Sequence, residues 1–180
     1  SLFPIQTPNP MSTYKAPLAD IRFALFDVLD SERTFSNLGF ADANRELIDA
    51  VLEESARFAE TVLAPLNRIG DTHGASYDKA TGKVTTTPGF KEAYAQFAAG
   101  GWTGLESPVE YGGQGMPHTM GTAMKEMVNA ANLAWGNFPL LSHGATEALL
   151  HHGEEWQKQA FLTPMVEGRW TGTMCLTEPH

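Results

Sequence analysis

The 180-residue sequence contains a single cysteine, Cys175. One cysteine cannot form an internal disulfide, and it cannot supply the ligands of a cysteine-based zinc site or an iron–sulfur cluster. The near absence of cysteine fits a reducing compartment, and we therefore expect a cytoplasmic protein.

Basic residues are also few. The sequence has 12 Lys and Arg against 21 Asp and Glu, a formal net charge of −9, and its basic residues are scattered from Lys15 to Arg169 without forming a block. Because nucleic-acid binding depends on clustered positive charge, this composition argues against a nucleic-acid partner.

Long apolar runs and the standard catalytic signatures are missing as well. The longest stretch without Asp, Glu, Lys or Arg, residues 127–146, includes Asn129, Asn132, Ser142 and His143 and is too polar for a membrane span. The sequence contains no GxGxxG, no GxxxxGK(S/T) and no GxSxG. It therefore predicts neither a standard phosphate loop nor a serine nucleophile.

What the sequence does contain is helical periodicity. Hydrophobic residues make up 42% and charged residues 18%, which is typical of a packed globular chain of one domain. Asp42 is the expected N-cap of a long helix that Pro65 kinks or ends, and Thr87 the cap of a helix that stops at Gly100. Further apolar stripes predict helices over residues 18–29, 117–135, 140–152 and 154–166, and a small hairpin lies within 70–87.

Only the tail, Trp170 to Thr177, has the composition of a strand, and no partner strand is predicted for it. We therefore predict an all-α helical bundle that ends in the first strand of a missing β-domain. The expected divisions are a mobile leader or cloning remnant over 1–13, an N-terminal extension helix over 14–40, a helical domain over 41–168 and the truncated start of the β-domain over 169–180.

The segment SPVEYGGQG, residues 107–115, is the clearest local motif. Ser107 and Glu110 have the spacing of a capping box, and Gly112 and Gly113 should end the turn at once. The motif is therefore either a capped turn that joins two helices or a turn that forms the wall of a ligand cleft.

Met116, Met120, Met124 and Met127 recur on one side of a predicted helix. Such a stripe is more often core than a cofactor site, but a pocket lined by it would suit a flexible apolar chain. Glu126 lies among these methionines and is predicted to be a surface residue, with a position in a cavity as the alternative. The spacing of the histidines His143, His151 and His152 is not that of a helical metal site, so no metal is predicted.

GRWTGTMCLTEPH, residues 168–180, and SPVEYGGQG together resemble the N-terminal helical domain of the flavin-dependent acyl-CoA dehydrogenases. The preceding run, HGATEALLHHGEEWQKQAFLTPMVE, also resembles the family helices that lead into a CxTEP strand. YKAPLADIRFALFDVLD, residues 14–30, is similar to the N-terminal extension of one branch of the family, which includes 3-methylmercaptopropionyl-CoA dehydrogenases.

The resemblance implies an FAD cofactor held between the helical domain, a middle β-domain and a C-terminal helical domain. By motif position, Met174, Leu176 and Thr177 would contact the flavin through backbone groups and the threonine hydroxyl. Met174 replaces an aromatic residue of many relatives, so ring stacking is not expected there. The family helix that matches Glu126 and Met127 contributes to the acyl-chain cavity, which makes these two the expected substrate-binding residues.

The implied reaction is α,β-desaturation of an acyl-CoA thioester by a homo-oligomeric enzyme of fatty acid metabolism that passes its electrons to an acceptor. In this family the carboxylate base belongs to the C-terminal domain, so we expect the chain to be an inactive N-terminal fragment with no catalytic residue of its own. The alternatives are an acyl-CoA oxidase or flavin monooxygenase on the same scaffold, and a non-catalytic helical interaction module.

Overall fold

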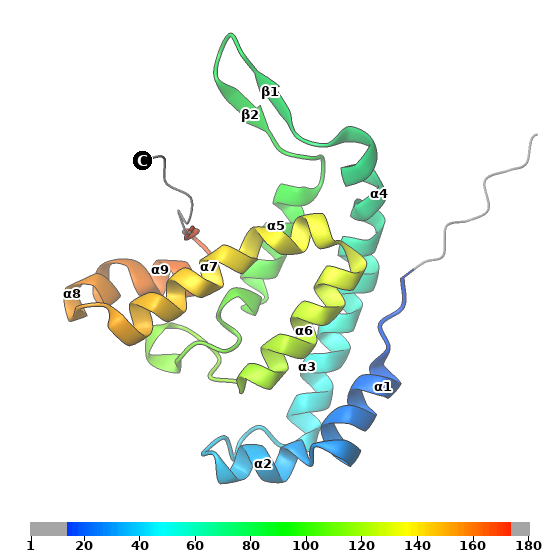
Figure 1. The fold of residues 1–180 in the computed structure, drawn as a ribbon, viewed down its shortest axis with the longest axis vertical. Coiled ribbons are helices and arrows are strands. Elements are labelled where there is room, and N and C mark those ends of the chain that lie inside the picture. Colours follow the sequence, from blue (N-terminus) through cyan, green and yellow to red (C-terminus); the bar gives the residue numbers. More distant parts are fainter. Residues whose placement is uncertain (1–13, 174–180) are drawn as a thin grey trace, which may run out of the picture.

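The computed structural model describes residues 14–173, and these residues are mostly helical, as predicted. The N-terminal segment contains α1 (Leu18–Arg22), which continues into the π-helical η1 (Phe23–Val28), and α2 (Ser31–Asn37). The helix α2 lies within the expected extension over 14–40, after the end of the helix predicted over 18–29. In Figure 1 this segment runs along the lower end of the molecule, beside α3.

Three consecutive helical segments form one long helix at the centre of the fold, which we call the central rod. They are α3 (Arg45–Phe58), the π-helical η2 (Ala59–Leu63) and α4 (Ala64–His73). The predicted cap was wrong: the side chain of Asn44, not of Asp42, accepts a hydrogen bond from the Leu47 amide at 3.0 Å. Only a residue directly before the first turn can reach these amides, and Asp42 lies three residues before Arg45.

Of the two effects expected of Pro65, a kink or an end of the helix, the end was wrong, because α4 continues past it. Pro65 lies in the first turn of α4, inside a continuous run of helical backbone, and has no N–H to donate to the preceding turn. The wider π turn of η2 changes the hydrogen-bond register directly before it. The rod therefore continues to His73.

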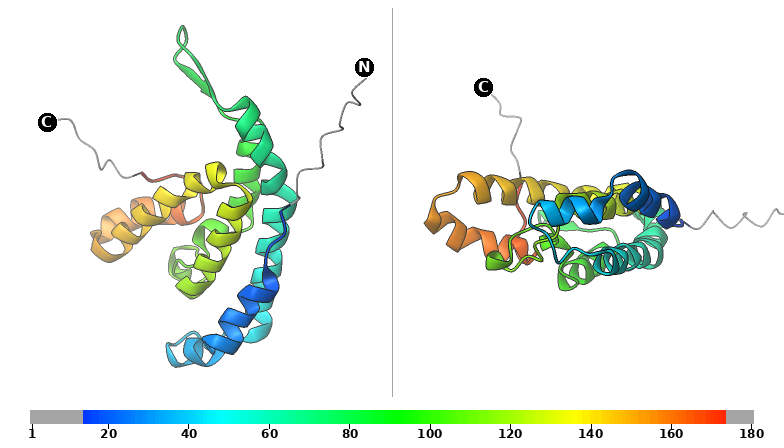
Figure 2. Two further views of the ribbon diagram at one scale, coloured as in Figure 1. Left: turned by 45° about the vertical axis from the view of Figure 1, so that its right-hand side comes forward. Right: turned by 90° about the horizontal axis from the view of Figure 1, so that it is seen from below.

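The predicted hairpin is present above the rod. Strands β1 (Ser76–Asp78) and β2 (Lys83–Thr85) pair antiparallel, with Tyr77 opposite Val84. The hairpin extends away from the helical body (Figures 1 and 2), and all six strand residues are exposed. It leads into α5 (Phe90–Ala99), whose N-cap is Gly89 with φ 85°, so the predicted cap at Thr87 was wrong, whereas the predicted stop at Gly100 is confirmed.

Two short 3₁₀ turns, η3 (Trp102–Gly104) and η4 (Val109–Tyr111), connect α5 to the second half of the fold. There α6 (His118–Ala131) packs beside α3, and α7 (Leu133–His152) leaves at an angle after a break at Asn132. The chain then turns back through α8 (Glu155–Gln157), η5 (Lys158–Leu162) and α9 (Thr163–Val166). Instead of beginning near 140, α7 begins at Leu133 and includes Pro139.

Aromatic and methionine side chains form the centre of the core. Phe97 and Trp135 meet edge to face with ring centroids 5.2 Å apart, and Phe58 packs against both. The buried indole of Trp135 donates its Nε1 proton to the Phe90 carbonyl at 3.2 Å. The four methionines of the predicted stripe are all buried, which confirms their interpretation as core residues.

Only the first half of the strand predicted over 170–177 lies within the described residues. Residues 170–173 have no strand assignment, and the rest of the predicted strand, 174–177, lies outside the described residues. None of the helices within 14–173 combines the length and the apolar character that a membrane span needs.

Candidate functional site

A pocket opens between α5, α6 and α7. Its cavity volume is about 70 Å³, enough for several water molecules, since one water needs about 10 to 15 Å³ by this measure. It is lined by residues of these three helices, of η3 and the segment after it, and of α9: Tyr94, Phe97, Trp102, Thr103, Leu105, Glu106, Ser107, Met124, Lys125, Val128, Asn129, Gly136, Pro139, Leu140, Ser142, His143, Thr146 and Met165.

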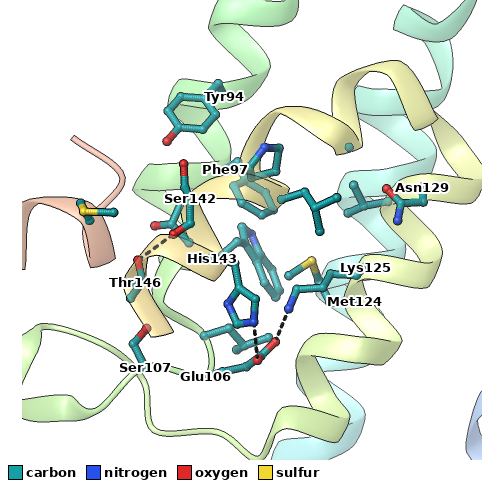
Figure 3. A pocket seen from close by; sticks show the side chains of 18 residues that line it. Tyr94, Phe97, Glu106, Ser107, Met124, Lys125, Asn129, Ser142, His143 and Thr146 are labelled. Carbon is teal, nitrogen blue, oxygen red and sulfur yellow. Dashed lines mark hydrogen bonds and ion pairs between the residues drawn. The ribbon is translucent and has the colours of Figure 1, made fainter. Parts of the chain in front are cut away.

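The two ends of the pocket differ in chemistry (Figure 3). Tyr94 and Phe97 lie at one end, close to α5. Glu106, Ser107 and His143 lie at the opposite end. We call these three residues and Lys125 the polar end of the pocket. The pocket can therefore hold a molecule that has an apolar body and a polar group.

Glu106 organises the polar end. Its side chain is only 6% exposed, and its two oxygens accept hydrogen bonds from Lys125 Nζ at 2.8 Å and from the ring of His118 at 2.6 Å. The Nε2 atom of His143 lies 3.6 Å from the same carboxylate, close enough for electrostatic attraction but too far for a hydrogen bond. One buried carboxylate thus fixes groups from both α6 and α7.

The position of Glu106 follows from the path of the loop around it. The segment 113–116 folds back on 104–107, and the amides of Gln114, Gly115 and Met116 donate to the carbonyls of Gly104, Ser107 and Leu105 at 2.9 to 3.0 Å. A Cβ atom at Gly113 would collide with the Ser107 carbonyl, so the close approach requires glycine.

This loop decides between the two interpretations of SPVEYGGQG. Pro108 precedes η4, and no side-chain bond caps that turn, so the predicted capping box of Ser107 and Glu110 was wrong. Ser107 is instead buried and lines the pocket. The second interpretation, a turn that forms the wall of a cleft, describes the structure.

Burial and neighbouring charges both shift the pKa values of Glu106 and His143. Burial alone would raise the pKa of Glu106, but the hydrogen bonds from Lys125 and His118 outweigh it, and the pKa lies below its ordinary value. Burial also lowers the pKa of His143, and the nearby Lys125 ammonium lowers it further. Glu106 is therefore charged and His143 neutral at pH near 7.

The chain that follows α9 is fastened to the pocket wall. The Gly172 amide donates to Ser142 Oγ at 3.1 Å, and a Cβ at Gly172 would come within 2.6 Å of side chains from α7 and α9. The expected flavin contacts Met174, Leu176 and Thr177 themselves lie outside the described residues.

The expected substrate-binding pair does not line this pocket. Met127 is fully buried in the core and Glu126 is exposed, as its surface interpretation predicted. From the same helix, the pocket is lined by Met124, Lys125, Val128 and Asn129. A contact of Glu126 or Met127 with an acyl chain stays a prediction.

Sequence reasoning missed Glu106, Lys125 and the role of His143 in this pocket. The only local signal was the position of Glu106 directly before SPVEYGGQG. Within the part of the chain that the structure describes, no group of three or more His, Cys, Asp or Glu side chains is arranged to hold a metal ion.

Comparison with known proteins agrees with the geometry. Residues 46–169 match the N-terminal domain of the acyl-CoA dehydrogenases. The chain is 42% identical over 173 residues to a 3-methylmercaptopropionyl-CoA dehydrogenase of Ruegeria pomeroyi, an alignment that covers 93% of this chain and 28% of the relative.

Two further relatives are more distant. A butyryl-CoA dehydrogenase of Syntrophomonas wolfei is 31% identical, over 92% of this chain and 27% of the relative. A broad-specificity linear acyl-CoA dehydrogenase of Mycobacterium tuberculosis is 30% identical, over 94% of this chain and 27% of the relative. The chain thus spans little more than a quarter of the length of these relatives, and through its helical domain it belongs to the acyl-CoA dehydrogenase family.

Proposed function

We propose that the complete protein containing this chain is an FAD-dependent dehydrogenase of short acyl-CoA thioesters, and that the pocket between α5, α6 and α7 receives the acyl group. The proposal rests chiefly on the bond between Gly172 and Ser142, because it fastens the segment leading to CLTEP to the pocket wall. A cofactor contacted by that segment would lie beside the open pocket.

The described residues fit the proposed cofactor in what they place around this segment. Gly172 is packed against α7 without room for a side chain, which holds the backbone where residues 174–177 begin. Met174, Leu176 and Thr177 remain the proposed flavin contacts, through two backbone groups and a hydroxyl. When bound, FAD would supply the acceptor for the two electrons removed from the acyl group.

The pocket residues would bind and orient the acyl chain. Phe97, Met124 and Leu140 offer apolar surface, and a thioether side chain such as that of Met124 adapts to ligands of different shape. A volume of about 70 Å³ suits a short chain. The 42% identity to an enzyme named for a short, sulfur-containing acyl-CoA supports the same size class.

Anaerobic titration of the purified complete protein tests the proposal. We expect butyryl-CoA and 3-methylmercaptopropionyl-CoA to bleach the flavin absorbance and to yield the α,β-unsaturated thioester. Benzoyl-CoA, which has no hydrogen on its α carbon, is the matched control and should leave the absorbance unchanged.

The alternatives give different results in the same assay. An acyl-CoA oxidase would consume oxygen in proportion to the product formed when air is admitted. A purified complete protein without flavin absorbance, or one that no acyl-CoA bleaches, would contradict the proposal and favour an interaction module. A cytoplasmic location remains an expectation from the single cysteine, and a homo-oligomeric state and a separate electron acceptor remain expectations from the family resemblance.

A further inference from the structure

The polar end of the pocket carries hydrogen-bonding capacity that the protein does not use. Among the described residues, the Ser107 hydroxyl and His143 Nδ1 have no hydrogen-bond partner. Lys125 donates one of its three N–H groups to Glu106. Figure 3 shows His143 between Glu106 and the space beside Ser107 and Thr146. These groups require water or a ligand as partner.

This unused capacity makes the pocket a poor site for a purely hydrocarbon chain. Such a chain would cover Ser107 and His143 and would offer no hydrogen bond in return. Ser107 is buried, and leaving a buried polar group without a partner costs about 1 to 3 kcal/mol, whereas the cost is smaller at His143, whose side chain is 31% exposed. A chain that carries a hydroxyl group at this depth avoids both costs, because it can accept one hydrogen bond and donate another.

The charges around the polar end favour a neutral group over an ion. The Glu106 carboxylate and the Lys125 ammonium compensate each other at 2.8 Å. His143 faces Lys125, Glu106, Glu147 and His118, and its lowered pKa keeps the imidazole neutral. A second ion on the ligand would therefore be buried without a counter-charge.

We propose that Ser107 and His143 are specificity-determining residues, and that the polar end selects acyl chains with a hydroxyl group, which can accept from Ser107 and donate to His143 Nδ1, over hydrocarbon chains of the same length. A thioether sulfur is a weak acceptor and has no proton to donate, so sulfur-containing chains rank between the two. This inference rests on the proposed function, because it takes the pocket as the acyl site.

The test compares kcat/KM of the complete, flavin-loaded enzyme for hexanoyl-CoA, γ-methylthiobutanoyl-CoA and 5-hydroxypentanoyl-CoA. The three chains have equal numbers of chain atoms, and the heteroatom lies outside the α,β-bond. We expect the wild type to prefer the hydroxy substrate. Ser107→Ala and His143→Leu should each lower the ratio of hydroxy to hexanoyl kcat/KM by about tenfold, the effect of one hydrogen bond of about 1.4 kcal/mol.

Controls separate recognition from general damage. His152→Leu changes an exposed histidine near the end of the same helix, outside the pocket, and should leave the ratio unchanged. His143→Asn keeps a hydrogen-bonding group and should restore part of the ratio, and Ser107→Ala carries the test if His143→Leu fails to fold.

Two outcomes would overturn the inference: a wild type that prefers hexanoyl-CoA, or substitutions that lower all three kcat/KM values equally. Failure of the proposed function looks different, because then none of the three thioesters reduces the flavin of the wild type.

Discussion

The carboxylate of Glu106 lies directly against the α6 backbone at Gly121, where a Cβ atom would overlap Oε1. This contact explains how a charged side chain from a loop becomes buried at the base of the pocket. It also lets Lys125, one helical turn further along α6, reach the same carboxylate.

Gly121→Ala should therefore destabilise the protein by about 2 to 4 kcal/mol, because the methyl group expels Glu106 and leaves its partners without a counter-charge. The gain in helix propensity of about 1 kcal/mol does not offset this. Gly70→Ala in α4 is the matched control: its Cβ would meet only the end of the Phe90 ring at 3.1 Å, and its effect should stay within about 1 kcal/mol. Denaturant unfolding of both variants measures the difference.

Glu106 should also make the protein sensitive to acid. Because the pKa of Glu106 lies below its ordinary value of 4.5 in the folded protein, the unfolded chain binds the proton more readily. Its contribution to the free energy of unfolding is complete above pH 4.5 and is lost as the pH falls toward the folded pKa. The stability difference between wild type and Glu106→Gln should therefore shrink with decreasing pH below 4.5.

A second variant checks the cause of this acid sensitivity. Lys125→Met removes a donor that lowers the pKa of Glu106, so the acid-dependent loss should move to higher pH. Thermal unfolding measured across this pH range would contradict the assignment if wild type and Glu106→Gln lost stability in parallel.

The elements that the sequence predicts best are those whose signal is local. Met120, Met124 and Met127 of α6 follow helical periodicity, and the Thr81–Gly82 turn marks the hairpin, so both elements could be located from a few neighbouring residues. The caps failed because several residues near each helix start can act as caps, and only the backbone path decides between Asp42 and Asn44.

The polar end of the pocket could not be predicted from local patterns. It joins Glu106 from a loop to Lys125, 19 residues later, and to His143 from another helix. These residues look like ordinary surface charges in the sequence, and their meeting depends on the angle between α6 and α7. Gly121 carries no pattern that announces a buried carboxylate above it.

That angle depends on Asn132, which is buried at the break between the two helices. Its Oδ1 accepts from the Trp135 amide at 3.1 Å, and its Nδ2 donates to the Leu63 carbonyl of the central rod at 3.2 Å. Asn132→Ala should cost about 2 to 4 kcal/mol, since it removes a helix cap and leaves a buried carbonyl without its donor.

Asn44→Ala provides the comparison for a cap alone. Asn44 is exposed and accepts only from Leu47, so its loss should cost about 1 kcal/mol. Equal costs for Asn44→Ala and Asn132→Ala in denaturant unfolding would show that the bond to the rod contributes nothing.

Two tyrosines offer the sharpest test of how buried hydroxyl groups affect this fold. The Tyr14 hydroxyl is buried and has no hydrogen-bond partner among the described residues, whereas the Tyr94 hydroxyl donates to the Gly168 carbonyl at 3.2 Å. Burial raises the pKa of both, and for Tyr14 the charges of Glu126 and Glu60 add to the shift. The same substitution therefore removes a cost at one position and a bond at the other.

Tyr14→Phe should raise the free energy of unfolding by about 1 kcal/mol, because phenylalanine keeps the ring and removes a buried polar group that lacks a partner. Tyr94→Phe should lower it by about 1 kcal/mol, because the Gly168 carbonyl loses its donor while the edge-to-face contact with Phe138 remains. Denaturant unfolding at neutral pH, where both phenols are protonated, resolves effects of opposite sign. A loss of stability in Tyr14→Phe as large as that in Tyr94→Phe would show that the Tyr14 hydroxyl is satisfied after all.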